Sequence, residues 1–574
     1  MVDLVVRGGT VVDGSGGPAA VADVAVDGGR VVEVGPGLGP ARRTIDAEGR
    51  IVCPGFVDLH THYDVQAFWD PALSPSPLHG ITTVVGGNCG FSVAPLAEGG
   101  ADYLLHMLAR VEGMPVASLE DACDWDWGSF GDYLGRLDGS LAVNAGFLVG
   151  HSPIRRAVMG AEACEREATA GEIEEMIALL GRSLAEGGLG FSSSLAATHN
   201  DGDGGPVPSR LASHDELVAL CEEVGRHEGT TLEFIPGVDA FGDAEAVLMG
   251  RMSAAADRPL NWNVLIVMAG LEELAREQLA ASDTAAGLGG RVLGLTMPAP
   301  VAPRLSFDSG FLLETIPGWH DAMNAPHAEK LALLASPQRR AQLLEAAAGQ
   351  AEGGRVLSGL ADFGQYVLSD LASDRFARFE GHTVREVAAE LGSDPFEVAC
   401  EIAVAEDLRC GFNFPPAGDG RADWEARLEV WRDDRAVIGA SDAGAHLDFL
   451  ATFNYTTAML RRAVLDLGLL DWPEAVSLLT DRPARLYGLR DRGRLAAGWW
   501  ADVCVIDPET LASDPVSPRH DLPGDQWRLY AGATGYEHVL VNGVAVVESG
   551  RLTGQRPGTV LRSGRDTETV HARG

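Results

Sequence analysis

The stretch from Ile51 to Gly90, IVCPGFVDLHTHYDVQAFWDPALSPSPLHGITTVVGGNCG, decides the fold expected for this chain. A short apolar run leads into His60 and His62. Alternate residues of a β-strand face the same side, so both imidazoles are expected to point the same way at the end of a strand. A second apolar run, bounded by glycines, predicts another buried strand that delivers Cys89. Imidazole and thiolate groups are ligands for zinc and similar metals, so this stretch predicts a metal site.

Strand and helix signals then alternate along the chain, as a (β/α)₈ barrel requires. Two segments have the periodicity of amphipathic helices, Gly171–Glu186 and Ser213–Glu228. The candidate barrel strands are residues 56–60, 81–86, 142–149, 188–193, 230–235, 260–267, 291–296 and 436–441.

The two ends of the chain have a different pattern, in which short strand-like pieces alternate with turn dipeptides such as Asn542-Gly543. Both ends are therefore expected to be halves of one small β-sandwich, made of residues 1–51 and 491–574. The barrel is expected over residues 52–490. The predicted fold class is α/β, a distorted TIM barrel flanked by this β-sandwich.

Three regions of the predicted barrel are longer than ordinary connections, near residues 97–140, 297–380 and 411–432. They contain Trp, Phe and Leu, which favours ordered segments over disordered ones. We expect them to be lids or pocket walls.

Composition excludes several kinds of partner. The 574 residues include 82 acidic and 44 basic ones, for a net charge of −38, which opposes binding to nucleic acid or to an anionic membrane. No apolar run is long enough for a transmembrane helix, and no secretory signal is visible. The eight cysteines have no paired spacing, which is typical of a reducing cytoplasm. The expected partner is a small-molecule substrate, with a homo-oligomer left open.

A family resemblance rests on three motifs. PGFVDLHTH followed by GITTV resembles the opening of the amidohydrolase superfamily, and GGNCGFS resembles its N-acyl-D-amino-acid deacylase (D-aminoacylase) branch. Near the other end, LRDRGRLAAGWWADVCVIDP is similar to the segment by which that family returns to its β-sandwich. The resemblance implies a metal-dependent hydrolase of carbon–nitrogen bonds other than peptide bonds.

Active sites of barrel enzymes lie at the carboxyl ends of the strands, so the residues that follow each strand are the candidates. Asp442 follows the last strand and resembles the superfamily's general base, which also touches the metal and later gives a proton to the leaving nitrogen. His446 is a candidate substrate contact. His151 follows the third strand and either contacts substrate or supports neighbouring groups. Arg210 lies in a polar, glycine-rich loop and is a candidate anion clamp.

The chain departs from the family pattern at two strands. Where typical members carry two further metal-binding histidines, this sequence places Glu233 and Asn263. The expected metal ligands are therefore His60, His62 and Asp442, with Glu233 and Cys89. Zinc fits the imidazoles and the thiol, whereas the added oxygen ligands favour manganese, magnesium or iron, and either one or two ions could bind.

The residues that bind the substrate's carboxylate in this branch also differ. The lysine after the second missing histidine is absent, and the loop after Asp442 lacks the expected arginine. An N-acyl-D-amino acid is therefore a less certain substrate than the resemblance alone implies. Five aromatic residues suggest a larger, more apolar pocket: Trp262, Trp319, Phe449, Phe453 and Tyr455.

The predicted function is metal-dependent hydrolysis of an amide or cyclic amide in a small N-acyl compound. Asp442 would act as base and then acid, while Asn263, His151 and His446 would orient the substrate or stabilise the oxyanion. The sequence leaves two alternative functions open. One is a non-hydrolytic metalloenzyme of the same fold: a decarboxylase, a cyclase or amide-forming enzyme, or a carbon–carbon lyase. The other is a metal-free barrel that binds a ligand.

Overall fold

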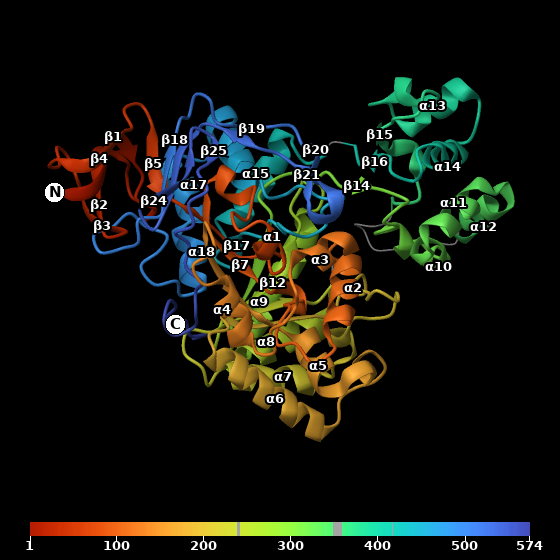
Figure 1. Cartoon of the computed structure of the whole chain (residues 1–574), viewed down its shortest axis with the longest axis horizontal. Coiled ribbons are helices and arrows are strands. Elements are labelled where there is room, and N and C mark those ends of the chain that lie inside the picture. The colour runs from red at the N-terminus through yellow and green to blue at the C-terminus, as the bar shows by residue number, and fades with distance from the viewer. Residues whose placement is uncertain (238–240, 348–358, 416, 574) are drawn as a thin grey trace.

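The computed structural model describes residues 1–237, 241–347, 359–415 and 417–573, and Figure 1 shows their arrangement. Strands and helices alternate through the middle of the chain, whereas both ends consist mainly of strands, so the fold is mixed α/β. No helix within these ranges has the length and apolar character needed to cross a membrane.

Strands from both ends of the chain pair in one sheet, in the order β25-β24-β23-β18-β5-β1-β2-β3, with β4 beside β1. The two ends meet where β5 pairs antiparallel with β18. Asn542 and Gly543, with φ angles of 49° and 79°, connect β23 to β24 in the hairpin that their sequence predicted. The strands of this sheet are β1 Val2–Val11, β2 Ala20–Asp27, β3 Arg30–Gly35, β4 Ala41–Asp46, β5 Ile51–Pro54, β18 Val503–Ile506, β23 Tyr536–Val541, β24 Val544–Glu548 and β25 Arg551–Leu552.

The middle of the chain contains parallel strands in two sheets, β6-β7-β8 and β17-β13-β12-β11-β10-β9. A single residue separates β8 from β9, and a parallel bridge between Thr61 and Ala443 joins the segments that follow β6 and β17. Each of the eight segments expected to be a strand contains one. The parallel strands are β6 Phe56–Asp58, β7 Ile81–Gly86, β8 Asn144–Phe147, β9 Val149–Gly150, β10 Gly190–Ser194, β11 Thr231–Ile235, β12 Leu260–Leu265, β13 Val292–Thr296 and β17 Ala436–Ile438.

Helices connect most of these strands. The expected helix Gly171–Glu186 is α6, where Thr169 and Glu172 form a capping box. The second expected helix is shorter than predicted: α7 begins after its N-cap Ser213 but ends at Val224, because Gly225 caps it and the chain turns there. The helices in this part are α1 Gln66–Trp69, α5 His151–Met159, α6 Ala170–Ala185, α7 His214–Val224, α8 Asp243–Ala256, α9 Glu272–Gly287, α15 Arg421–Trp431, α16 Tyr455–Met459, a π-helix Leu460–Asp466, α17 Trp472–Leu479 and α18 Asp481–Leu486.

The three long regions are built differently from one another. Residues 97–140 form α2 Ala101–Val111, α3 Val116–Ala122 and α4 Phe130–Leu137. Outside these regions, two short antiparallel strand pairs lie in the C-terminal part, β19 Ala512–Ser513 with β22 Ala533–Thr534 and β20 Ser517–Leu522 with β21 Gln526–Tyr530. Residues 348–358, within the expected 297–380 region, lie outside the described residues.

The segment from β14 to β16 has a hydrophobic core of its own, and we call it the insert. It lies at the opposite edge of the molecule from the terminal sheet (Figure 1). Residues such as Phe307, Trp319, Phe363 and Phe412 pack together there. The expected region 411–432 divides between the insert strand β16 and the separate helix α15. The insert contains β14 Arg304–Leu305, α10 His320–Asn324, α11 His327–Ala335, α12 Pro337–Ala347, β15 Val367–Ser369, α13 Val384–Leu391, α14 Pro395–Ala405 and β16 Gly411–Asn413.

Candidate metal centre

His60 and His62 lie just beyond the end of β6, where backbone hydrogen bonds hold them on both sides. The N–H of His62 donates to the carbonyl of Ala443 at 2.8 Å, and the carbonyl of His60 accepts from the N–H of Asp442 at 3.0 Å. Both residues are 3% exposed, and their ring centroids are 5.2 Å apart. The strand end thus presents two buried imidazoles close together, as the spacing predicted.

Cys89 reaches the same place from the end of β7. Gly87 and Cys89 both have positive φ, 73° and 54°, which turns the chain sharply after the strand. The Cys89 sulfur lies 3.5 Å from Nε2 of His60. The ligand atoms of His60, His62 and Cys89 all lie within 4.8 Å of one another. Burial, and then the charge of Glu233, raise the pKa of the Cys89 thiol well above its usual value.

Asp442 supplies a carboxylate between the histidines. Its Oδ1 lies 3.1 Å from Nε2 of His62 and 3.5 Å from Nε2 of His60, and its Oδ2 lies 3.5 Å from Nε2 of His446. Burial alone would raise the pKa of Asp442, but hydrogen bonds from His60 and His62 hold it well below the usual value. Asp442 is therefore a carboxylate that faces three imidazoles.

Glu233 and Asn263 both lie beside Cys89. Oε2 of Glu233 accepts a hydrogen bond from the Cys89 N–H at 2.8 Å, and Oε1 lies 4.0 Å from Nδ1 of His60. Burial raises the pKa of Glu233 to about 7. The Asn263 amide nitrogen lies 3.7 Å from the Cys89 sulfur. Glu233 Oε1, Asn263 Oδ1 and His60 Nδ1 are buried and have no hydrogen-bond partner among the described residues.

The three other predicted residues have different surroundings. His446 contacts Asp442, as given above. His151 is completely buried and both of its ring nitrogens are engaged, one with Ser193 Oγ and one with Glu216 Oε1, each at 2.9 Å. Arg210 is half-buried; it donates to the carbonyl of His199 at 3.1 Å and to Asn200 Oδ1 at 2.6 Å, and no described carboxylate forms an ion pair with it. His446 therefore joins the cluster, whereas His151 belongs to a network with Glu216.

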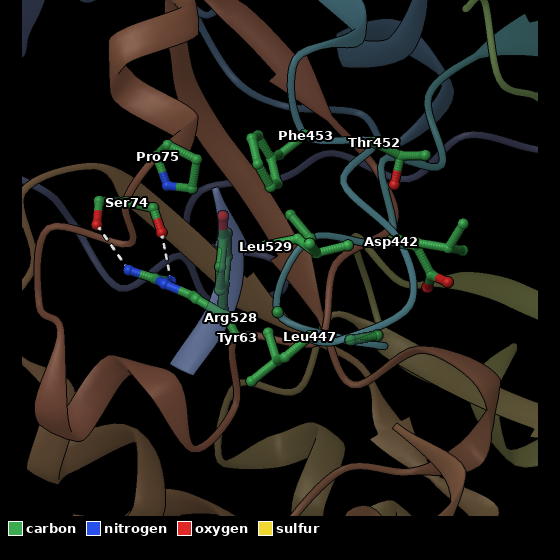
Figure 2. Close-up of a pocket in the computed structure, with 13 residues that line it drawn as sticks. Tyr63, Ser74, Pro75, Asp442, Leu447, Thr452, Phe453, Arg528 and Leu529 are labelled. Atoms are coloured by element: carbon green, nitrogen blue, oxygen red, sulfur yellow. Dashed lines mark hydrogen bonds between the residues drawn. The ribbon is translucent and has the colours of Figure 1, made fainter. Parts of the chain in front are cut away.

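A small cavity lies beside Asp442 (Figure 2). Of the five aromatic residues expected in the pocket, Phe453 lines this cavity, together with Tyr63, Leu447 and Leu529. Figure 2 shows Arg528 directed toward Ser74, across the cavity from Asp442, and it donates to the Ser74 carbonyl at 3.0 Å. The expectation for Trp319 was wrong: it is 1% exposed inside the core of the insert, where it stacks on Phe363.

Two further residues at this centre carry no signal in the sequence. Glu112, at the end of α2, is 2% exposed and its Oε1 lies 3.3 Å from Nδ1 of His62. Burial, and then Asp442, raise the pKa of Glu112 well above its usual value. Phe311, from the insert, places its ring centroid 4.6 Å from that of His446. Neither residue belongs to a motif, and both come from long connecting regions whose packing no local pattern predicts.

The donor set fits a divalent metal ion. Two imidazoles, a thiol and an ionised aspartate converge there, and among the described residues the buried Glu233 Oε1 has no hydrogen-bond partner. Leaving such a group unpaired is unfavourable, and a cation would satisfy it. Parallel strands that end in this cluster define the chain as a metalloenzyme of the mixed α/β class.

Comparisons with known proteins name the family. The model of the amidohydrolase family matches residues 43–547, and the chain belongs to that family. It is 29% identical to an N-acyl-D-glutamate deacylase of Alcaligenes xylosoxydans xylosoxydans, over 98% of this chain and 96% of that protein.

Two solved structures show the same fold. A D-aminoacylase with a binuclear metal centre has a TM-score of 0.63 at 27% identity, covering 98% of this chain and all of that one. An N-acyl-D-glutamate deacylase of Bordetella bronchiseptica, solved with zinc and a phosphonate inhibitor, has the same TM-score and coverage at 24% identity, which shows the fold alone. The chain is thus a metal-dependent hydrolase of non-peptide carbon–nitrogen bonds with a divalent metal cofactor and a small-molecule substrate. The non-hydrolytic and metal-free alternatives are not favoured.

Proposed function

We propose that this enzyme hydrolyses the amide bond of small N-acyl amino acids, with the D-enantiomers as the preferred substrates. The observation that carries the proposal is the ionised Asp442 carboxylate held against His60 and His62, beside Cys89. The D-configuration is inferred from similarity to the D-amino-acid deacylases named above.

We propose His60, His62, Cys89, Glu233 and Asp442 as the metal ligands. A divalent metal held there would polarise the scissile carbonyl and lower the pKa of the attacking water. Asp442 would take a proton from that water and pass it to the leaving nitrogen, a role that requires the anionic state its hydrogen bonds maintain. Asn263 lies beside the Cys89 thiol, and His446 lies beside the Asp442 carboxylate. Both would orient the substrate oxygen on which negative charge develops.

Recognition of the substrate's carboxylate is assigned to Arg210. Both of its hydrogen bonds within the described residues come from Nη1 and go to the 199–200 segment, and no described carboxylate neutralises it. A planar guanidinium can bind a carboxylate through two parallel hydrogen bonds. His151, whose ring nitrogens are both engaged, would support this side of the site without contacting substrate.

We further infer that the eight parallel strand segments form one distorted, closed TIM barrel over residues 52–490. The parallel bridge from Thr61 to Ala443 and the single residue between β8 and β9 support closure. Residues 1–51 and 491–574 would form the flanking β-sandwich. A reducing cytoplasmic location agrees with the eight free cysteines. A homo-oligomer stays a prediction, which the molar mass of the protein in solution would test.

The experiment is a hydrolysis assay on paired N-acetyl-D- and N-acetyl-L-amino acids with the zinc-loaded and manganese-loaded enzyme. We expect acetate release from the D-series, lost in Asp442→Asn. Arg210→Ala should raise KM for N-acyl amino acids but leave unchanged the KM for N-acyl amines, which lack a carboxylate and serve as the control substrates. No acetate release from any N-acyl compound by metal-loaded enzyme would overturn the proposal.

The same preparations test the ligand set. Elemental analysis should find at least one metal ion per chain in the wild type and fewer in Glu233→Gln and Cys89→Ala. Full metal occupancy in Glu233→Gln would show that Glu233 lines the site without binding the metal.

A further inference from the structure

We propose that Glu112 is a positioning residue of the metal centre, one that orients His62 through its side chain and His446 through its main chain. The inference rests on the proposed function, because it takes His62 as a metal ligand. Through Glu112, the 97–140 region would help to hold the metal ligands in place, whereas the sequence led us to expect a lid or a pocket wall there.

The contacts of His62 define the first half of the proposal. Its Nε2 faces Asp442 Oδ1 at 3.1 Å, and its Nδ1 faces Glu112 Oε1 at 3.3 Å. A histidine that donates its Nδ1–H to a carboxylate presents the Nε2 lone pair on the opposite side of the ring. Metal-binding histidines are commonly held in this way, which fixes the tautomer and makes the ligand more basic. Glu112 is placed to do this for His62.

The main chain of Glu112 supplies the second half. Its carbonyl accepts a hydrogen bond from the N–H of His446. The next residue, Gly113, has a φ of +60° and lies so close to this loop that a Cβ there would be 3.3 Å from the Cα of His446. The positive φ together with this tight contact favours glycine here, where the His446 backbone lies against the end of α2. The C-cap residue of α2 thus contacts two of the histidines that face Asp442.

Packing holds Glu112 itself in place. One face of α2 is buried through Leu104, Leu108 and Val111, among others. On the insert side, Arg110 forms an ion pair with Glu314 and donates to the carbonyl of Ser309 at 3.0 Å. Glu112 therefore has little freedom to move away from His62, and its buried carboxylate cannot be one of the many surface acids that give the chain its charge.

The test compares metal binding by the wild type, Glu112→Gln and Glu112→Asp, with Glu120→Gln as the matched control. Glu120 is an exposed glutamate on the neighbouring helix α3. The dissociation constant for Zn²⁺ is measured by competition with a chromogenic chelator, without substrate, and the visible spectrum of the Co²⁺-loaded protein reports the ligand geometry. Thermal unfolding of the metal-free proteins measures any purely structural effect.

We expect the dissociation constant for Zn²⁺ to rise about 10- to 100-fold in Glu112→Gln, the range found when such a supporting carboxylate is removed, with a changed Co²⁺ spectrum. Glu120→Gln should match the wild type. Equal affinity in wild type and Glu112→Gln, with only the metal-free unfolding temperature lowered, would overturn the positioning role. Glu112→Asp keeps the carboxyl group on a shorter side chain and serves if the glutamine variant does not fold. A wild type that binds no metal would instead refute the proposed function along with this inference.

Discussion

Asp442 is the residue on which the chemistry of the centre converges. It follows a strand, has a φ of 56°, and lies among His60, His62 and His446. Because its neighbours donate hydrogen bonds to the charged form, it is anionic at neutral pH in spite of its burial. A base that is already ionised can accept a proton directly.

Replacement of Asp442 by asparagine should lower kcat by a factor on the order of 10² to 10⁴ while leaving the protein folded, because the amide keeps the shape of the side chain but cannot accept the proton. Amine release measures the rate, and far-ultraviolet circular dichroism checks the fold. The control is Asp434→Asn, an exposed aspartate close to the start of the same strand. Turnover near the wild-type rate in Asp442→Asn would contradict the assigned role.

Residues at strand ends could be located from the sequence, whereas residues from the long regions could not. His60, His62, Cys89 and Asp442 each follow a strand and Glu233 lies within one, and the register of a strand fixes which way its side chains point. Glu112 and Phe311 reach the same centre only because α2 and the insert pack against the 446–449 loop. Such packing depends on tertiary contacts between distant segments, which periodicity does not encode.

At the scale of elements, the insert contributes to the site through Phe311. The ring lies 4.6 Å from that of His446 and 5.1 Å from that of Phe449, so it connects the separate core of the insert to the loop after Asp442. A half-buried aromatic ring in this position is placed to contact the apolar part of a substrate.

Phe311→Ala should therefore raise KM for substrates with long apolar groups more than for N-acetyl substrates, with a smaller effect on kcat. The difference should be about 1–3 kcal/mol, or roughly 5- to 150-fold in kcat/KM, the usual value of a hydrophobic contact in a pocket. Steady-state kinetics on an acyl-chain series measures it. Leu344→Ala, which shortens an exposed leucine of the insert helix α12, is the control. An equal loss for all chain lengths would show that Phe311 acts only by holding the loop.

A second link between elements is the buried His79, which connects the segment before β7 to C-terminal parts of the chain. Its Nδ1 contacts Thr457 Oγ1 at 2.8 Å and its Nε2 contacts the carbonyl of Ala531 at 3.1 Å. Burial lowers the pKa of His79 from 6.5 to about 4. The folded protein therefore resists protonation that the unfolded chain accepts.

The sign of the pH effect follows from this difference. Between pH 6.5 and pH 4 the unfolded chain binds a proton that the folded chain does not, so stability present above pH 6.5 is lost as the pH falls, by an amount on the order of 3 kcal/mol. The unfolding temperature of His79→Gln should fall less steeply over this range than that of the wild type. His382→Gln, at an exposed position, is the control. Parallel curves for wild type and His79→Gln would contradict the assignment.

For the whole molecule, the metal centre joins segments that lie far apart in the sequence. His60 and His62 follow β6, Cys89 follows β7, Glu233 lies in β11 and Asp442 follows β17. The terminal sheet joins the two ends of the chain in a comparable way, through β5 and β18. The unfolded chain has no preformed arrangement of these ligands, so the metal should bind the folded protein almost exclusively.

Removal of the metal should therefore lower the unfolding temperature, and restoring it should raise that temperature in proportion to the logarithm of the free metal concentration. At a free concentration 100 times the dissociation constant, the stabilisation amounts to about 2.7 kcal/mol. Differential scanning calorimetry of chelated and reloaded enzyme measures the effect, and His60→Asn/His62→Asn should abolish the dependence without a large change in the metal-free protein. Metal that binds with full stoichiometry but leaves the unfolding temperature unchanged would contradict this prediction. The ion would then not link distant segments, and its ligands would lie within one segment of the chain.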